Sequence, residues 1–389
     1  MINTPLTAEP SLIDFYPDFY TEPKSQLKEI KADDLELTKC RRFGISYMGS
    51  KNKIVKALIL QLPSAKYFVD LFAGGCAMTH GAMLSGKYER FITNDISDAP
   101  SLFQRAIKGE FRDEKRWISR DDFFALKDSD PYVRYCWSFG NKGTAYLYSK
   151  EIEPYKKAFW EFAVFKNPEP LRAYGFNVDE LLDLPTSYER RIAFRQYLAK
   201  MPFVDKKGSH FYYKPSELKK YQGFNNNTML DNLQNLESLQ SIESLQNIER
   251  LQSLERLQSL ERLQNLERLQ SLQSLQRLER LERLEIHQKD YKKVELPEPS
   301  ECVIYCDPPY INSEGYHKQT LKNGKTSFNH GEFYDYVESL ARRGYKVFIS
   351  EYEMPKDRFK SVFSVAKRQQ LHHLGAGAIK QEHLFMPIV

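Results

Sequence analysis

The stretch KYFVDLFAGGCAMTHGAML at residues 66–84 contains the pattern that indicates the fold class most clearly. KYFVDLF is a short apolar run that ends at a glycine pair, and AMTHGAML continues with apolar residues at helical spacing. RFITNDIS (90–97) then gives a second buried strand, which closes on the polar pair Asn94-Asp95. A strand, a glycine turn, a helix and another strand indicate a parallel sheet with crossover helices. We therefore predict an α/β fold.

Short buried strands resume near the other end of the chain. LEIHQKDYKKV (284–294), ECVIYCDPPY (301–310) and YKVFISEY (345–352) each carry an apolar run of strand length. KRQQLHHL (367–374) and EHLFMPIV (382–389), joined by a GAGA turn, are predicted to form an antiparallel pair at the sheet edge. A long insertion therefore splits one sheet.

Changes in composition predict five segments. A polar, proline-containing arm comes first, and a lobe that mixes aromatic residues with lysines separates the two halves of the sheet. In chain order the segments are an N-terminal arm (1–40), a first half of the sheet domain (41–98), the lobe (99–232), a leucine repeat (233–285) and a second half of the sheet domain (286–389).

The leucine repeat places Leu or Ile at every third position 18 times in succession, from Leu233 to Leu284. In an α-helix a step of three residues turns the side chain by about 300°, so the leucines would spread around the whole circumference. In a 3₁₀-helix they would form one column, and a flat strand is excluded because it needs a period of two. We expect a helix, with the 3₁₀ form as an alternative to the α form. Its role is open between a spacer, clamp or self-association arm and a repeat expanded without function.

The charge distribution favours a polyanionic partner without requiring one. The net charge is +5, and the repeat holds nine Glu and seven Arg, so the basic excess lies outside the repeat. No apolar run reaches about 18 residues, and the N-terminal stretch lacks the pattern of a leader. These features predict a cytoplasmic protein without a membrane segment.

The cysteine and histidine patterns predict no metal site. The five cysteines are scattered and lack paired zinc spacing, so we expect reduced thiols. His372, His373 and His383 lie on predicted edge strands, where histidines are usually surface residues.

The strongest chemical signal is Asp307-Pro308-Pro309-Tyr310, which directly follows the apolar run VIYC. An amine on an aromatic ring is a weak nucleophile, because its lone pair is delocalised into the ring. The carboxylate of Asp307 and the carbonyl of Pro308 can accept both amine hydrogens and aim the lone pair at an electrophile. The prolines stiffen the turn, and Tyr310 can stack on a flipped base. The alternative is a strand-ending turn in which Asp307 is only a cap.

A second motif, DLFAGG (70–75), joins a strand end to a helix and suits a cofactor that approaches the backbone closely. A glycine pair alone is more often a tight turn. Asp95, at the end of the next strand, strengthens the cofactor interpretation because a carboxylate can accept from both hydroxyls of a ribose. Upstream, YMGSK (47–51) either offers Lys51 to a carboxylate or is a plain surface loop.

These motifs, in the order YMGSK, DLFAGG, Asn94-Asp95 and DPPY, resemble motifs X, I, II and IV of the Dam-like adenine-N6 DNA methyltransferases. The resemblance implies a Rossmann-like, mixed seven-stranded sheet with helices on both faces and an inserted target-recognition lobe. It also implies transfer of a methyl group from S-adenosylmethionine to the N6 amine of a flipped-out adenine in double-stranded DNA.

The resemblance further assigns roles to residues. The implied catalytic residues are Asp307, Pro308, Pro309 and Tyr310. The implied cofactor-binding residues are Tyr47, Lys51, Asp70, Phe72, Ala73, Gly74 and Asp95. Ser350 and Glu351 match a later strand of such folds. The chain departs from the family pattern at Cys76, where a small residue such as glycine is common, and in the leucine repeat.

Two segments of the lobe mix aromatic with basic side chains, namely CWSFGNKG (136–143) and KKGSHFYYKP (206–215). Such segments can contact phosphates and read base edges, although a folded lobe with ordinary surface lysines has the same composition. From the first segment we select Phe139, Asn141 and Lys142 as DNA-binding candidates.

The expected mechanism is direct in-line transfer without a covalent enzyme intermediate. Methylation of a ring carbon would need a nucleophilic cysteine next to proline, whereas Cys306 precedes Asp307 and is predicted to be a buried strand residue. The alternatives are methylation of RNA adenine, cytosine N4 or a protein glutamine, and a non-enzymatic scaffold that binds partners through the repeat.

Overall fold

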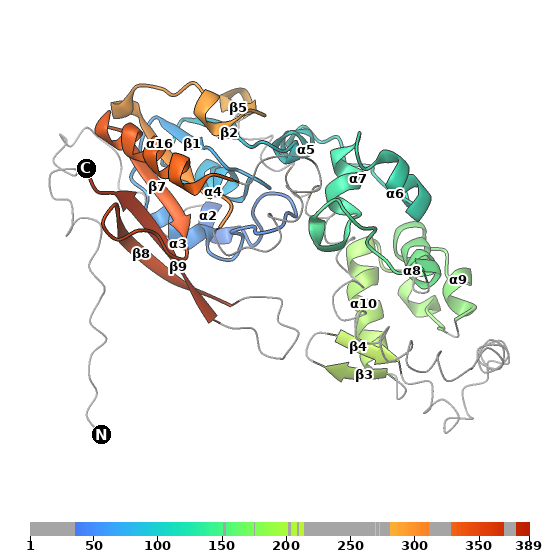
Figure 1. Cartoon of the computed structure of the whole chain (residues 1–389). Helices are drawn as coiled ribbons and strands as arrows, with labels where there is room; N and C mark the ends of the chain where they lie inside the picture. The colour runs from blue at the N-terminus through green and yellow to red at the C-terminus, as the bar shows by residue number, and fades with distance from the viewer. Residues whose placement is uncertain are drawn as a thin grey trace, which may run out of the picture. The chain divides into compact units, whose positions relative to one another are not determined.

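Two compact units make up the chain in the computed structural model. The described residues are 36–150, 153–174, 176–200, 204–207, 210–213, 269, 272, 281–310, 328–368 and 379–389. The first unit comprises residues 1–109 and 272–389, and the second comprises residues 110–271. Figure 1 labels their elements. None of the described helices has the length and apolar character needed to cross a membrane.

The first unit is built on a seven-stranded sheet with the order β5-β2-β1-β6-β7-β9-β8. Its strands are β1 (Tyr67–Asp70), β2 (Arg90–Asn94), β5 (Leu284–His287), β6 (Cys302–Cys306), β7 (Lys346–Glu351), β8 (Phe359–Arg368) and β9 (Ile379–Pro387). Neighbouring strands from β5 to β7 are parallel, whereas β9 is antiparallel to both β7 and β8. The prediction of a mixed seven-stranded α/β sheet is confirmed.

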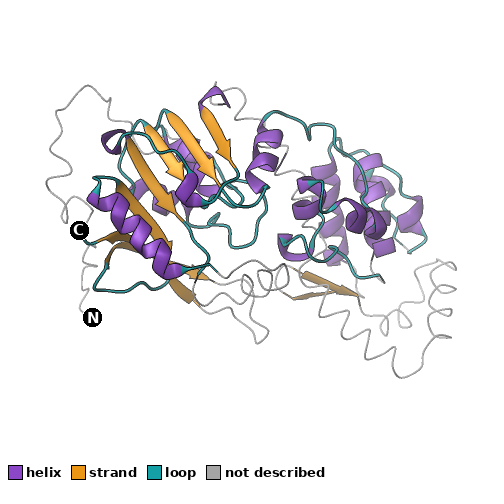
Figure 2. Cartoon of the chain, turned by 45° about the horizontal axis from the view of Figure 1, so that its top comes forward, coloured by secondary structure: helices purple, strands orange, loops and turns teal. Residues whose placement is uncertain are grey.

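Helices cover both faces of this sheet (Figure 2). The helices of the first unit are α2 (Glu36–Lys39), α3 (Val55–Gln61), α4 (Ala77–Ser85), α5 (Ala99–Ile107) and α16 (His330–Arg342), with short 3₁₀ turns η6 (Leu281–Arg283), η7 (Tyr291–Lys293) and η8 (Pro299–Glu301). Since successive side chains of a strand point to opposite faces, each central strand contributes to two packed layers.

The two layers of the core differ in their helices. On one face, Val69 and Ile304 belong to a buried cluster with Phe333 of α16. On the other face, Phe68 stacks near Tyr305 with ring centroids 6.4 Å apart. Helix α4 is buried along its whole length and contacts both α2 and α3, which explains why apolar residues occur on all of its sides.

The second unit is mainly helical and holds an aromatic core. Its elements are α6 (Arg120–Leu126), α7 (Pro131–Cys136), η3 (Phe139–Asn141), α8 (Glu153–Phe165), α9 (Glu169–Arg172), η4 (Asp179–Leu181), α10 (Ser187–Lys200) and the antiparallel pair β3 (Val204–Lys207) and β4 (His210–Tyr213). Tyr132, Trp137 and Phe162 are fully buried, and Trp117 stacks on Tyr148 at 5.7 Å. Aromatic side chains therefore stabilise this unit.

Two boundaries differ from those expected. The units divide after Gly109, whereas the sequence pattern placed the start of the lobe at residue 99. The intervening segment forms α5, which contacts β5 and so belongs to the sheet unit. Strand β8 begins at Phe359, ahead of the predicted strand 367–374, because the run FKSVFSVAKR pairs with β9 from its first residue, with a register shift between Ser361 and Phe363.

The leucine repeat lies outside the described residues except at Leu269, Leu272 and 281–284. At its end, Leu281–Arg283 forms the 3₁₀ turn η6, which leads directly into β5. The helix type of the whole repeat stays a prediction. The N-terminal residues 1–35 and the GAGA turn also lie outside the described residues.

Candidate active site

The motif residues gather at the carboxyl edge of the sheet. Asp70 is the last residue of β1, and Asp307 directly follows β6. These two strands are adjacent and parallel, with Asp70 paired to Tyr305, so their carboxyl ends lie side by side. Glu351 ends β7, the next strand. Open parallel sheets bind ligands at this edge, which makes it the candidate active site.

Lys51 of the YMGSK loop contacts the carboxylate of Asp307. The Lys51 Nζ atom lies 2.6 Å from both Asp307 oxygens, and the lysine side chain is only 4% exposed. The loop is shaped by backbone hydrogen bonds from Ile54 and Val55 to the Lys51 carbonyl, which start α3. The first and fourth motifs, far apart in the sequence, thus meet through one buried ion pair.

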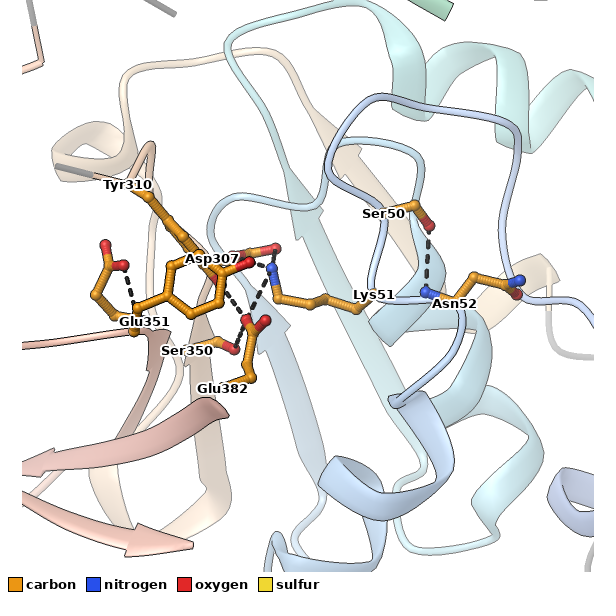
Figure 3. Close-up of polar contacts among 9 residues, drawn as sticks. Ser50, Lys51, Asn52, Asp307, Tyr310, Ser350, Glu351 and Glu382 are labelled. Atoms are coloured by element: carbon orange, nitrogen blue, oxygen red, sulfur yellow. Dashed lines mark hydrogen bonds and ion pairs between the residues drawn. The ribbon is translucent and has the colours of Figure 1, made fainter. Parts of the chain in front are cut away.

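Glu382 of β9 completes this cluster and was not found from the sequence. Its Oε1 atom lies 3.3 Å from Lys51 Nζ and accepts a hydrogen bond of 2.9 Å from Ser350 Oγ. The Tyr310 hydroxyl donates to the same oxygen. Figure 3 shows Lys51, Tyr310 and Ser350 converging on Glu382. The available signal was an acidic residue on a strand face shared with the apolar Leu384 and Met386.

The carboxylates keep Lys51 charged despite its burial. Burial alone would lower the pKa of Lys51, but attraction and hydrogen bonding from Asp307 and Glu382 more than offset it and raise the pKa above its ordinary value. The Lys51 ammonium also lies 4.7 Å from the centroid of the Tyr310 ring. Burial is the main cause that raises the pKa of Tyr310 well above its ordinary value, and the negative charges of Asp307 and Glu382 add to it. The Tyr310 hydroxyl therefore stays protonated and remains a donor.

Glu351 has an environment that disfavours its charge. Burial raises its pKa to about 8, the negative charge of Asp307 adds to this effect, and a hydrogen bond from the Tyr352 N–H opposes it. The Tyr352 ring packs edge-on against Tyr310 with centroids 4.8 Å apart. The end of β7 therefore forms one wall beside the DPPY turn.

The DPPY turn is also anchored to α16. The His330 Nε2 atom lies 2.8 Å from the carbonyl oxygen of Pro309. His330 begins α16, whose N-cap is Asn329, and the Asn329 side chain accepts a hydrogen bond from the Glu332 N–H. His330 carried no sequence signal, because its partner is a backbone atom. Pro308 is buried.

The glycine pair of DLFAGG makes room for the YMGSK loop. A Cβ atom built on Gly74 would lie 2.8 Å from the Tyr47 ring, and one on Gly75 would lie 2.6 Å from the Tyr47 Cβ atom. The Tyr47 hydroxyl in turn lies 3.4 Å from Ser97 Oγ. These glycines are therefore required by the protein's own packing, in addition to any ligand.

Asp95 joins the ends of β1 and β2. Its Oδ2 atom accepts a hydrogen bond of 2.7 Å from the Gly74 N–H, and its Oδ1 atom accepts one of 2.8 Å from the Ser97 N–H. Burial raises the pKa of Asp95. The neighbouring Ala73 N–H donates to the Asn94 carbonyl at 2.8 Å. Asp95 thus shapes the glycine turn itself.

Asp70 and Phe72 both point into the core. Asp70 is 1% exposed; its Oδ2 atom accepts from Thr79 Oγ1 at 2.9 Å, and its Oδ1 atom has no partner among the described residues. Burial raises the pKa of Asp70 to about 7. The Phe72 ring packs against Tyr291 and Phe333, with centroids 5.0 and 5.5 Å away. For Phe72, contact with a cofactor would therefore involve mainly the backbone.

Cys76 adopts a backbone conformation that favours glycine. It is the N-cap of α4, with a φ of 58°, and its side chain is fully buried. Burial raises the pKa of its thiol well above the ordinary value. The departure from the family pattern at this position thus places a strained but well-packed residue at the start of α4.

The DNA-binding candidates lie together in the second unit. Phe139 and Asn141 form part of η3, and Lys142 follows directly. Phe139 is 39% exposed, whereas the Asn141 amide donates to the Tyr135 carbonyl at 2.8 Å. Asn141 therefore stabilises the turn, and the turn carries Phe139 and Lys142, which are both exposed to solvent.

Potential metal ligands do not cluster in the part of the chain that the structure describes. No group of three or more His, Cys, Asp or Glu side chains is arranged there to hold an ion. His383 instead pairs with Ser361, with Nδ1 and Oγ 3.0 Å apart, and the predicted strand residues His372 and His373 lie outside the described residues.

Comparison with known protein families identifies the family of this chain. The family model described as D12 class N6 adenine-specific DNA methyltransferase matches residues 47–136 and 261–374. The first matched segment begins at Tyr47 and includes the glycine turn, and the second includes the DPPY turn. No curated protein matches the chain.

Proposed function

This chain belongs to the D12 class N6 adenine-specific DNA methyltransferases, which methylate the N6 amine of adenine in DNA, and on that basis we propose roles for its residues. The target amine is held at the DPPY turn, and S-adenosylmethionine is held at the adjoining ends of β1 and β2. The observation that carries this proposal is the position of Asp307 at the carboxyl edge, next to Lys51 and to the glycine turn.

Asp307 and the Pro308 carbonyl prepare the amine for attack. The Asp307 carboxylate and the Pro308 carbonyl accept hydrogen bonds from the two amine N–H groups, which draws the nitrogen toward tetrahedral geometry and localises its lone pair. The anchoring of Pro309 by His330 limits movement of the turn. The residues thus align a weak nucleophile without becoming covalently bound to it.

Tyr310 provides the surface on which the extruded adenine rests. Its hydroxyl is held by Glu382 and its ring packs nearly perpendicular to the Tyr352 ring, so the Tyr310 ring has a fixed orientation. A base removed from the stack loses stacking energy of a few kcal/mol, and an aromatic side chain restores part of it.

The charges at the carboxyl edge fit a cationic cofactor. Asp70 and Asp95 both have raised pKa values, caused first by burial, and one oxygen of Asp70 has no partner among the described residues. A positive charge nearby would offset the cost of these buried carboxylates. When bound, S-adenosylmethionine supplies an electrophilic methyl group on a sulfonium. The residues that would hold it are Tyr47, Lys51, Asp70, Asp95 and the backbone of Phe72, Ala73 and Gly74.

Cys306 has no role in the proposed transfer. It is fully buried in β6, and burial raises the pKa of its thiol well above the ordinary value. A thiol in this environment is a poor nucleophile. This property supports direct transfer to the amine over methylation of a ring carbon through a covalent cysteine adduct.

Double-stranded DNA is the proposed partner, and the second unit is proposed to recognise its target sequence. The exposed Lys142 and Phe139 suit contacts with phosphates and bases, and Asn141 supports their turn. Such an enzyme would act in the cytoplasm of a bacterium or of a phage-infected host.

The proposal is tested by incubating the protein with unmethylated bacterial DNA and labelled S-adenosylmethionine, followed by nucleoside analysis and methylation-aware sequencing. Wild-type protein should label N6-methyladenine at one sequence, and Asp307→Ala should lower kcat by at least roughly a hundredfold. Asp335→Ala, which changes an exposed carboxylate of α16, is the control and should leave activity unchanged.

Other outcomes distinguish the alternatives. Label in RNA or protein, with none in DNA, would contradict the DNA substrate. Full activity of folded Asp307→Ala would contradict the proposed role of the DPPY turn. Absence of both cofactor binding and transfer in wild-type protein would favour a scaffold.

A further inference from the structure

We propose that Glu382 is a positioning residue for methyl transfer, which holds Lys51 and Tyr310 in place and keeps Asp307 available as an acceptor. This inference rests on the proposed role of Asp307. Glu382 touches neither the amine nor the cofactor in this proposal; it acts through the residues that do.

The first step of the argument is competition for Asp307. Lys51 Nζ lies 2.6 Å from both Asp307 oxygens, which are the atoms that the amine needs. A lysine with no other partner would be drawn fully onto this carboxylate. Glu382 provides a second acceptor 3.3 Å from the same Nζ atom, so the ammonium can be shared between two carboxylates.

The second step concerns net charge. Lys51 carries one positive charge, while Asp307 and Glu382 carry two negative charges, which leaves the trio with a net negative charge. Negative charge strengthens the hydrogen bonds that Asp307 accepts from the amine. Without Glu382 the pair Lys51–Asp307 would be neutral, and Asp307 would be a weaker acceptor.

The third step is the rigidity of Glu382. It is fully buried, and Ser350 donates to Oε1, the atom that also contacts Lys51 and Tyr310. The neighbouring His383 pairs with Glu351 in the β7–β9 ladder, so the strand backbone fixes the position of Glu382 at the carboxyl edge. One oxygen atom therefore couples the lysine to the ring that would support the base.

Glu382→Gln tests this proposal, because it removes the charge while retaining the size of the side chain and one acceptor oxygen for Ser350 and Tyr310. In steady-state methylation of target DNA, kcat should fall roughly tenfold to hundredfold, the scale of one charge-assisted hydrogen bond, while the KM values for DNA and cofactor change little. Lys51 faces Asp307, Glu382, Tyr310 and, at longer range, Glu351. Loss of one carboxylate should lower its pKa and move the alkaline limb of the kcat profile to lower pH.

Glu301→Gln is the matched control, since Glu301 pairs with Lys66 on the surface and should show neither effect. Lys51→Met and the double variant Lys51→Met/Glu382→Gln complete a double-mutant cycle. If Glu382 acts through Lys51, the double variant should lose no more kcat than Lys51→Met alone. A folded Glu382→Gln protein with wild-type kcat and pH profile would overturn the proposal, as would additive losses in the cycle.

A second variant covers the case in which Glu382→Gln does not fold. Glu382→Asp keeps the charge but withdraws the carboxylate from Lys51 and Tyr310. The value of kcat should fall, while the alkaline limb of the profile should move less than in Glu382→Gln because the negative charge is retained. An unchanged kcat would overturn the proposal. Asp307→Ala distinguishes the two proposals. If it abolishes transfer while both Glu382 variants retain full kcat, only the role of Glu382 fails.

Discussion

Lys51 is a buried cation that is kept charged by two carboxylate partners, Asp307 and Glu382. A buried ion pair is weak evidence for stability, because desolvation opposes the attraction between the charges. The cluster around Lys51 is better explained by function than by stability, since the single atom Lys51 Nζ links the YMGSK loop to the DPPY turn and to β9. The raised pKa values of Asp70 and Glu351 nearby fit the same view, because perturbed carboxylates concentrate at functional sites.

Glu351 makes a testable contribution to stability. Its pKa is raised by burial from 4.5 to about 8, so between these values the folded state holds a proton that the unfolded state lacks. Stability should therefore fall as pH rises through this window, by at most about 1.4 kcal/mol per pH unit from this group. Glu351→Gln stays neutral and keeps an oxygen for the Tyr352 N–H. Its free energy of unfolding should exceed that of the wild type increasingly from pH 5 to pH 8.

Denaturant unfolding of both proteins at several pH values measures this difference. Asp70 also lowers the free energy of unfolding as the pH rises, but it does so equally in both proteins, so its contribution cancels in the comparison. A constant difference across the window would show that Glu351 is already ionised at low pH in the folded protein.

At the scale of elements, the turn between β1 and α4 depends on close packing against the YMGSK loop. Gly75→Ala should destabilise the protein by about 1–3 kcal/mol, the cost of overpacking, because the new Cβ would lie 2.6 Å from Tyr47 and 2.8 Å from the Ile45 carbonyl. It should also weaken cofactor binding, since Tyr47 and Gly74 lie in the proposed cofactor site.

Gly331→Ala is the control for this turn. It lies in α16, where the nearest atom to an added Cβ is 3.5 Å away, and alanine is the better helix former. Thermal unfolding should give it an equal or higher midpoint than wild type, and isothermal titration should give unchanged cofactor affinity. Equal midpoints for Gly75→Ala and wild type would mean that the YMGSK loop can shift to accommodate the new Cβ atom without loss of stability.

Strand β9 shows what element-level pairing adds to the site. The sequence predicted this strand and its antiparallel pairing with the strand before it, but it did not predict the pairing with β7 on the other side. Because β9 lies between β7 and β8, Glu382 reaches the end of β7 and not the outer edge of the sheet. A strand at the edge would have exposed the same glutamate to solvent.

At the scale of the whole molecule, DNA binding and cofactor binding are expected to be separable. Lys142 lies in the second unit, and the proposed cofactor residues lie in the first. Lys142→Ala should weaken DNA binding and reduce the slope of log affinity against log salt by about 1 if the lysine contacts one phosphate. Cofactor affinity should not change.

Fluorescence anisotropy with labelled duplex DNA at several salt concentrations measures this slope. Lys66→Ala is the control, because Lys66 pairs with Glu301 in the first unit. An unchanged slope for Lys142→Ala would show that Lys142 does not contact a phosphate.

The amino-acid sequence alone was enough to predict the α/β class and the strands that carry the motifs, and it is the basis for the chemistry proposed at the DPPY turn. These features are local: a strand, a glycine turn and a proline turn are specified by residues within a few positions of each other. The order of the motifs was also sufficient to indicate the family, which the match to residues 47–136 and 261–374 confirms.

The contacts between side chains of the site became known only from the tertiary structure. The contacts of Lys51 with Asp307 and Glu382 span 256 and 331 positions of the chain, and the hydrogen bond from His330 ends on a backbone carbonyl. Likewise, the role of Gly75 follows from its proximity to Tyr47 and not from its neighbours in sequence. Such contacts depend on strand order and loop packing, which are set by burial across the whole sheet and leave no local pattern to read.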